Sequence, residues 1–252
     1  MSNVEEISSP IIGVKPWFEA ADELRARDYS VIAGESIAEW AGVSLEQWED
    51  FAEYWNRLTP DRFMGDGGTY RLRRYGQFET ASDGTLRQLP HASYEQPSYI
   101  NRLNGGIARE FEPLESGFAQ HAILHNILNV LMMIVNDVEW VFTPWNVKLH
   151  PYRIVAKPDA AGQPTPEGLH RDGVNYIVSM MVKRANIIGG ESSLTDAQRT
   201  PLDRVTLAEP MHLMILNDEN TMHEVTPVSP VNPQTTAYRD VLVIAFAKVF
   251  ND

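Results

Sequence analysis

The half of the chain that begins at Val138 is a succession of short alternating or apolar runs separated by turns. No segment of helical period lies between these runs, and strands joined in this way form antiparallel sheets. The pattern therefore predicts a sandwich or barrel, with a jelly roll as the candidate fold. The expected strands are Trp145–Ala156, Val174–Val182, Ser192–Leu194, Arg204–Leu207, His212–Asn217, Met222–Val225 and Ala237–Val249.

The half of the chain before Val138 is predicted to be helical or mixed. Ser44 opens a capping box, and three aromatic residues follow at helical spacing as expected core anchors: Trp48, Phe51 and Trp55. A largely apolar helix is expected over about residues 118–135 and should pack on a sheet. The segment Thr69–Glu79, which turns at residues 81–84 and resumes at Thr85, resembles a hairpin.

These patterns predict one domain over residues 1–252, of the mainly β class with some α structure. Residues 138–252 are expected to form the core, a double-stranded β-helix or jelly roll. Residues 1–137 are expected to form an extension whose helices buttress that core.

Composition excludes several classes of function. A net charge of −13 leaves no general basic face for phosphate backbones, so nucleic acid is not an expected partner. The run Arg71-Leu72-Arg73-Arg74 is interpreted as a solvated strand face, with a local basic patch as the alternative. Without cysteine, any metal must be held by histidines and carboxylates. The first residues do not resemble a signal peptide and no apolar run reaches membrane-spanning length, so a cytoplasmic protein without a membrane partner is expected.

His170 and Asp172 stand two residues apart at the mouth of the predicted strand Val174–Val182. Side chains at i and i+2 of a strand project to the same side, so these two could share a metal ion. Such a tripeptide also occurs often by chance, so its surroundings must supply the specificity.

A third ligand should come from a distant strand that folds back beside the first. His223 begins a short strand after the polar turn 217–220 and is preferred to His212, which is better explained as a strand-start histidine. Two histidines and one carboxylate on one face of a metal leave open positions, which suits Fe(II) and O₂ activation. Zinc could occupy the same ligands.

Arg239 distinguishes these possibilities, because it could anchor a chelating cosubstrate. It begins the last long strand, in which Val241, Val243, Ala245 and Ala247 share its face while Leu242, Ile244 and Phe246 take the other. A guanidinium at the head of a row of mostly small side chains is suited to grip a carboxylate at the end of a cavity.

With these residues the chain resembles the Fe(II)- and 2-oxoglutarate-dependent dioxygenases. The resemblance rests on the motif residues His170, Asp172, His223 and Arg239, and on the segment 186–191 after the first core strand. More narrowly, the chain resembles the bacterial branch of L-isoleucine 4-hydroxylase and related free amino acid hydroxylases. One position departs from the pattern, since some members carry a serine where this chain has Val241.

The resemblance implies that Fe(II) is held by His170, Asp172 and His223, and that 2-oxoglutarate chelates the iron and places its far carboxylate on Arg239. Oxygen completes the reaction, which hydroxylates an unactivated C–H bond and releases succinate and CO₂. No catalytic residue beyond the metal ligands is expected.

A small-molecule substrate, a free aliphatic amino acid similar to isoleucine, leucine or methionine, needs a partner for its carboxylate, and Arg153 is the candidate. A structural salt bridge is the alternative role for Arg153. Two other functions stay open: an oxygenase acting on a protein side chain or a carrier-bound intermediate, and a cupin-like metal-binding jelly roll without 2-oxoglutarate. Arg239 speaks against the last.

Overall fold

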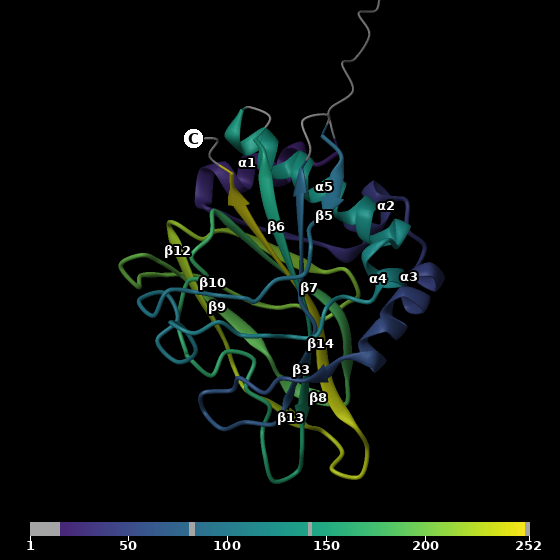
Figure 1. The fold of residues 1–252 in the computed structure, drawn as a ribbon, viewed down its shortest axis with the longest axis vertical. Coiled ribbons are helices and arrows are strands. Elements are labelled where there is room, and N and C mark those ends of the chain that lie inside the picture. The colour runs from purple at the N-terminus through teal and green to yellow at the C-terminus, as the bar shows by residue number, and fades with distance from the viewer. Residues whose placement is uncertain (1–15, 81–83, 141–142, 250–252) are drawn as a thin grey trace, which may run out of the picture.

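The computed structural model describes residues 16–80, 84–140 and 143–249, and a long antiparallel sheet is its main feature (Figure 1). Seven strands are hydrogen-bonded in the order β1-β11-β7-β14-β6-β3-β2, while β4 pairs with β6 and β5. The strands of this sheet are β1 Tyr29–Ile32, β2 Thr59–Pro60, β3 Arg71–Arg73, β4 Gly76–Thr80, β5 Leu86–Gln88, β6 Trp145–Ala156, β7 Tyr176–Ala185, β11 Leu213–Asn217 and β14 Ala237–Lys248.

Two smaller sheets form a second layer. One has the order β10-β9-β12 and the other pairs β13 with β8. An apolar cluster that contains Leu194 of β9 and Val241 of β14 joins the second layer to the long sheet. These strands are β8 Ile187–Gly189, β9 Glu191–Asp196, β10 Pro201–Thr206, β12 Thr221–Val225 and β13 Val228–Pro230. Two antiparallel layers over a shared interior confirm the predicted jelly roll.

Each strand predicted after Val138 corresponds to an observed one, although β10 begins three residues before its predicted start and β8 and β13 were not predicted. β6 has the predicted bounds, and β14 ends one residue before the predicted end. β7 begins two residues after the predicted start, because the chain after His170 first makes a turn. The hairpin is present as the β4–β5 pair, although its predicted turn includes residues 81–83, which lie outside the described ones.

Helices cover one face of the long sheet (Figure 1): α1 Phe18–Arg27, α2 Gly34–Ala41, α3 Leu45–Ala52, α4 Ser116–Ala119 and α5 Ala122–Glu139, with a 3₁₀ helix at Glu53–Arg57. The capping box is present, since the Ser44 hydroxyl accepts from the Gln47 N–H while the Gln47 side chain accepts from the Ser44 N–H. The three predicted core aromatics are buried. The expected helix over 118–135 is instead two helices, because His121 caps α5 by accepting from the Ile123 N–H.

The apolar face of α5 packs against the sheet, as predicted. The largest core cluster joins Leu128 and Leu131 of α5 to Leu242, Ile244 and Phe246 of β14. By length and composition α5 could cross a membrane, but half of it is buried inside the fold, as in the core helix of a globular protein.

The opposite face of β14 looks into the space between the two layers. Arg239, Val241 and Val243 line a cavity there, as the alternation predicted. His150 and Tyr152 of the neighbouring strand β6 line the same cavity. One face of the long sheet thus packs against the helices in the core, and the other face lines the cavity.

Candidate active site

His170 and His223 are direct cross-strand partners. Each donates its backbone N–H to the carbonyl of the other, at 3.0 and 2.9 Å, in an antiparallel bridge. Paired residues present their side chains to the same side, so the ring centroids lie 4.5 Å apart. A distant histidine therefore folds back beside the first, as predicted. His212 does not line the cavity, and its Nδ1 accepts from the Ala208 N–H instead.

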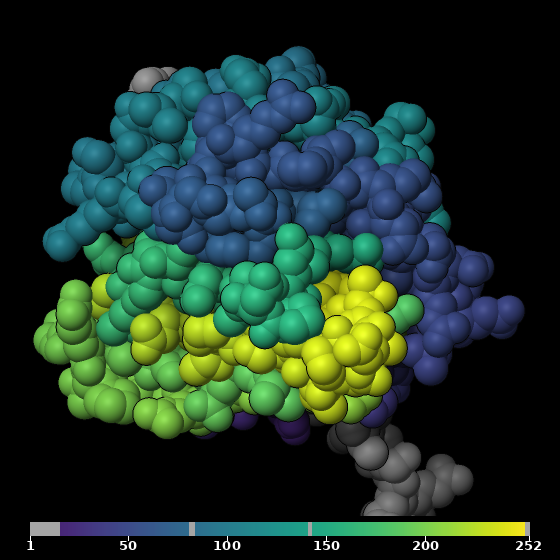
Figure 2. Space-filling model, turned by 90° about the horizontal axis from the view of Figure 1, so that it is seen from below, coloured from purple at the N-terminus to yellow at the C-terminus, as the bar shows by residue number. Residues whose placement is uncertain are grey.

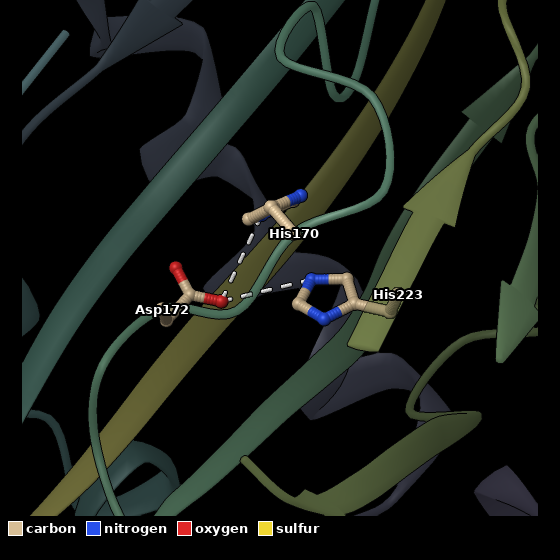
Figure 3. A group of neighbouring side chains, drawn as sticks. All are labelled: His170, Asp172 and His223. Atoms are coloured by element: carbon tan, nitrogen blue, oxygen red, sulfur yellow. Dashed lines mark ion pairs between the residues drawn. The ribbon is translucent and has the colours of Figure 1, made fainter. Parts of the chain in front are cut away.

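Asp172 completes the cluster, although it does not do so through strand alternation. It lies in the turn before β7, and its Oδ2 is 3.9 Å from Nε2 of His170 and 3.6 Å from Nε2 of His223 (Figure 3). Asp218 fixes this turn, because its carboxylate accepts from the backbone N–H groups of Asp172, Gly173 and Val174 at 2.7–3.0 Å. His170 and Asp172 converge as predicted. The physical cause is the buried carboxylate of Asp218, which holds the turn that carries Asp172.

The donor set suits a divalent metal ion. One donor atom from each of His170, Asp172 and His223 lies within 4.8 Å of the other two. Nδ1–H of His170 donates to the Gly168 carbonyl at 2.8 Å. The other ring nitrogen, Nε2, carries the lone pair and faces Asp172. Oδ2 of Asp172 is buried and has no hydrogen-bond partner within the described ranges. Such an orphaned carboxylate oxygen between two imidazoles fits Fe(II) or another ion that accepts nitrogen and oxygen ligands.

Burial changes the protonation of these groups in the protein without metal. It raises the pKa of the Asp172 carboxyl to about 7. It also lowers the pKa of the His223 imidazole well below its usual range, and a charge on His170 adds to that effect. His223 is therefore neutral at pH 7, which is the form that binds a metal.

Arg239 is a buried charge within the cavity. It is 3% exposed, and its side chain makes no ion pair or hydrogen bond to any residue that the structure describes. Burial, together with the positive charge of Arg184, lowers the pKa of Arg239 to about 10, so it stays charged at neutral pH. An unpaired buried guanidinium favours an anionic ligand.

The run Arg71-Leu72-Arg73-Arg74 is not the solvated strand face that the sequence suggested. Arg71 and Arg73 are 7% and 2% exposed and line the cavity. Asp61 is buried beside them and lies 2.7 Å from Nη2 of Arg71 and 3.7 Å from Nη1 of Arg73. Their strand, β3, pairs with β6, and Arg71 and Arg73 stand opposite Ile154 and Tyr152, which face the cavity. The two arginines therefore lie on the inner face of the sheet.

Arg153 does not line the cavity, which contradicts its predicted role. Its neighbours on β6, Tyr152 and Ile154, face the cavity, so strand alternation turns Arg153 to the other side. There it forms a bidentate ion pair with Asp240, with both hydrogen bonds at 2.7 Å. The structural salt bridge, the alternative role, is the observed one.

Sequence reasoning missed three residues around the site. Asp218 was seen only as part of a polar turn, and Gln96 and Arg109 lie in a segment of loops. Gln96 donates to the Asp172 carbonyl at 3.1 Å and accepts from Arg109 at 2.8 Å. Their positions depend on long-range folding of residues 94–109 onto the cavity, which local patterns do not encode.

A family model described as 2OG-Fe dioxygenase matches residues 52–245, which is more than half of the chain. The chain belongs to the 2OG-Fe dioxygenase family. As a member of this family it is an oxygenase that uses Fe(II), 2-oxoglutarate and O₂, and the resemblance found in the sequence is confirmed. The matched region includes the cluster of His170, Asp172 and His223.

Similar proteins support this assignment over nearly the whole chain. The 3(1)-hydroxy-L-isoleucine 4-dioxygenase of Pantoea ananatis is 24% identical over 241 residues, which cover 91% of this chain and 96% of the relative. A bsmA homolog from Methylobium petroleophilum PM1 has a crystal structure with a TM-score of 0.84 and 32% identity, covering 91% of this chain and 92% of that one. IDO from Bacillus thuringiensis shares the fold, with a TM-score of 0.76, 18% identity and coverage of 92% and 95%.

Proposed function

We propose that His170, Asp172 and His223 hold the Fe(II) of this dioxygenase. The proposal is supported by the convergence of the three donor groups and by the orphaned Oδ2 of Asp172. Three protein ligands leave positions for 2-oxoglutarate and O₂. The bound iron, with both of these, supplies the oxidising chemistry that inserts oxygen into a C–H bond while 2-oxoglutarate becomes succinate and CO₂.

Arg239 is the proposed anchor for the far carboxylate of 2-oxoglutarate. Its unpaired charge in the cavity is the observation that carries this assignment. A dicarboxylate with one end near the metal cluster and the other on Arg239 would neutralise that charge. Val241 lines the cavity beside it and offers no hydroxyl, so the hydrogen bond that some members take from a serine there is not available.

The proposed reaction is hydroxylation of a free aliphatic L-amino acid. The relative from Pantoea ananatis, which is named for a hydroxylated isoleucine, supports this substrate class. The cavity supports it as well, because it combines charged groups with the apolar side chains of Ile154, Val225, Val241 and Val243. The residues of the chain bind and orient the substrate, exclude water and hold the reacting C–H bond near the iron.

A succinate-release assay tests the function. The protein is supplied with Fe(II), 2-oxoglutarate and each of the twenty amino acids, together with side-chain-hydroxylated isoleucine. We expect an aliphatic amino acid to stimulate succinate release and to gain one oxygen atom by mass spectrometry. Binding of 2-oxoglutarate without stimulation by any of these compounds would refute the substrate class and favour a protein-bound or carrier-bound substrate. Asp172→Ala should abolish coupled turnover, and unchanged activity in this variant would refute the metal assignment.

A further inference from the structure

The proposed function leaves one group of cavity charges unexplained. Arg73 and Arg109 line the same cavity as the metal cluster, and each is only 2% exposed. Guanidiniums carry only hydrogen-bond donors and do not bind a metal, and Arg239 is the proposed anchor of the cosubstrate. We propose that Arg73 and Arg109 bind the carboxylate of the substrate, an inference that rests on the proposed function.

The local charges do not balance. Three guanidiniums, those of Arg71, Arg73 and Arg109, line the cavity, and Asp61 is the carboxylate that contacts them. Glu167 lines the cavity as well, with Oε1 3.6 Å from Nε2 of His170, so two carboxylates face three guanidiniums and one positive charge is in excess. Asp61 is engaged mainly by Arg71, at 2.7 and 2.8 Å, whereas the nearest atom of Arg73 is 3.7 Å away. Arg109 has no ion pair within the described part of the chain, and its hydrogen bond goes to the neutral Gln96. Buried positive charge in excess favours a bound anion.

Both guanidiniums have unused donors. Nε of Arg73 and Nε of Arg109 are buried and have no hydrogen-bond partner among the described residues. Nη2 of Arg73 lies 2.5 Å from Nδ1 of His150, whose pKa is held well below its usual range by burial and by the surrounding cations, so this imidazole is a neutral acceptor. His150 is therefore uncharged and does not balance the positive charge of Arg73, so an anion is still needed.

Aromatic rings hold the two guanidiniums in place. The Arg73 guanidinium lies 3.5 Å from the centroid of the Phe111 ring, and that of Arg109 lies 4.8 Å from the centroid of Tyr94. Stacking fixes the plane of a guanidinium and so prepares its donors for a planar carboxylate before the ligand arrives. The site is thus preorganised rather than assembled from mobile surface side chains.

The position of Arg109 suits a substrate rather than a cosubstrate. Gln96 bridges Arg109 to the backbone carbonyl of Asp172 through hydrogen bonds of 2.8 and 3.1 Å. A carboxylate on Arg109 would therefore lie on the side of the cavity that is formed by the turn of Asp172. The other cation, Arg239, lies on β14, separated from β3 by β6. Figure 2 shows this end of the molecule from below, where the part of the chain coloured blue borders the part coloured green, and the C-terminal part (yellow) lies on the other side of the green part.

The experiment compares two ligands that differ only in the carboxylate. They are the best amino acid of the panel and the corresponding amino alcohol, in which a CH₂OH group replaces the carboxylate. Their dissociation constants are measured by calorimetry with Fe(II) and 2-oxoglutarate in the absence of oxygen, so that no turnover occurs. The wild-type protein should bind the amino acid with a dissociation constant about 10- to 100-fold lower than that of the amino alcohol, which is the effect expected from hydrogen bonds to a charged group.

Arg73→Gln and Arg109→Gln should each reduce this preference about tenfold or more and leave the dissociation constant of 2-oxoglutarate unchanged. Arg109→Lys keeps the positive charge but loses the planar guanidinium that binds a carboxylate with two hydrogen bonds. It provides a variant with a milder effect on folding. Arg87→Gln is the matched control, because it removes an exposed strand arginine that is paired with Glu79 outside the cavity.

Three results would overturn the inference. If both ligands weaken equally, so that the preference survives, the arginines have a structural role. If the substitutions weaken 2-oxoglutarate instead, the pair serves the cosubstrate. If Arg87→Gln has the same effect, the change is not local. The proposed function fails separately, when no amino acid stimulates succinate release in the wild-type protein.

Discussion

The carboxylate of Asp218 accepts hydrogen bonds from three consecutive backbone N–H groups, those of Asp172, Gly173 and Val174. Asp218 is 1% exposed, so these bonds are made away from water, and charge-assisted bonds of this kind are strong. Gly173 has a φ of +78°, which a side chain would strain, and this allows the turn that the carboxylate stabilises. Asp218 thus positions Asp172 without belonging to the cluster itself.

We predict that Asp218→Asn weakens metal binding by about 10- to 100-fold, the usual effect of losing a partner that orients a ligand. The amide of asparagine keeps one acceptor but loses the charge that holds the turn. Calorimetric titration with Fe(II) without oxygen measures the effect. Glu219→Gln is the control, because the neighbouring Glu219 side chain takes no part in the turn. Equal metal affinities of the two variants would contradict the positioning role.

His150 should make the stability of the fold depend on pH. Burial and the nearby cations, first of all Arg73, hold its pKa well below 6.5, and it packs between the rings of Tyr75 and Tyr94. Below pH 6.5 the unfolded chain gains a proton on this histidine that the folded protein does not. The free energy of unfolding therefore falls as the pH falls, by up to about 1.4 kcal/mol per pH unit.

The His150→Gln variant should lose this contribution. Between pH 7.5 and 5.5 its free energy of unfolding should fall less than that of the wild type, by roughly 1.4 kcal/mol. Urea unfolding at both pH values measures the difference, and the other titrating groups cancel in the comparison. Parallel losses in the two proteins would mean that His150 takes up a proton in the fold.

Among the elements, β6 shows what a sequence pattern can and cannot predict. Its bounds were predicted from alternation, and the alternation also placed residues on two faces. Which of the two faces lines the cavity depends on the segments that pack against each face, and the sequence of the strand alone does not encode this. For this reason Arg153 was assigned to the cavity although it lies on the other face, and the arginines of β3 were assigned to solvent although they line the cavity.

Arg153→Gln tests the two faces of β6. The substitution leaves the carboxylate of Asp240, which is 1% exposed, without its partner, and breaking a buried pair in this way should cost about 3 kcal/mol of unfolding free energy. The Michaelis constants for the amino acid and for 2-oxoglutarate should not change. Urea unfolding and steady-state kinetics provide the two readouts. A higher Michaelis constant for the amino acid at unchanged stability would return Arg153 to the site.

At the scale of the whole molecule, the motif residues were predictable because they belong to short patterns. His170, Asp172, His223 and Arg239 were found in the sequence by spacing and strand position, and the structure brings all four to one cavity. Asp218, Gln96 and Arg109 were not, because their roles arise from contacts between segments far apart in the chain. Helix and strand order gave the fold class, whereas the break before α5 depended on one capping histidine.

The two predicted parts of the chain share one core. Strands β1, β3 and β4 come from the first part, and they pair with strands of the second. The largest apolar cluster likewise joins Phe51 and Leu128 to Phe246. We infer that the described residues before and after Val138 unfold as one cooperative domain, so a ligand bound in the cavity should stabilise both parts.

This coupling leads to a prediction about thermal stability. A ligand that binds the folded protein adds about 2.7 kcal/mol at a concentration 100 times its dissociation constant, which for a chain of this size raises the melting temperature by roughly 5–10 °C. Fe(II) should give such a rise in anaerobic scanning calorimetry, and 2-oxoglutarate should add a second. A chelator should reverse both, because 2-oxoglutarate binds through the metal.

Two variants separate the contributions. Arg239→Met should keep the rise due to Fe(II) and lose most of that due to 2-oxoglutarate, since the partner of the far carboxylate is gone. Without ligands this variant should be at least as stable as the wild type, because it no longer buries an unpaired charge. Asp172→Ala should lose both rises. A full 2-oxoglutarate effect in Arg239→Met would show that the unpaired guanidinium serves another anion.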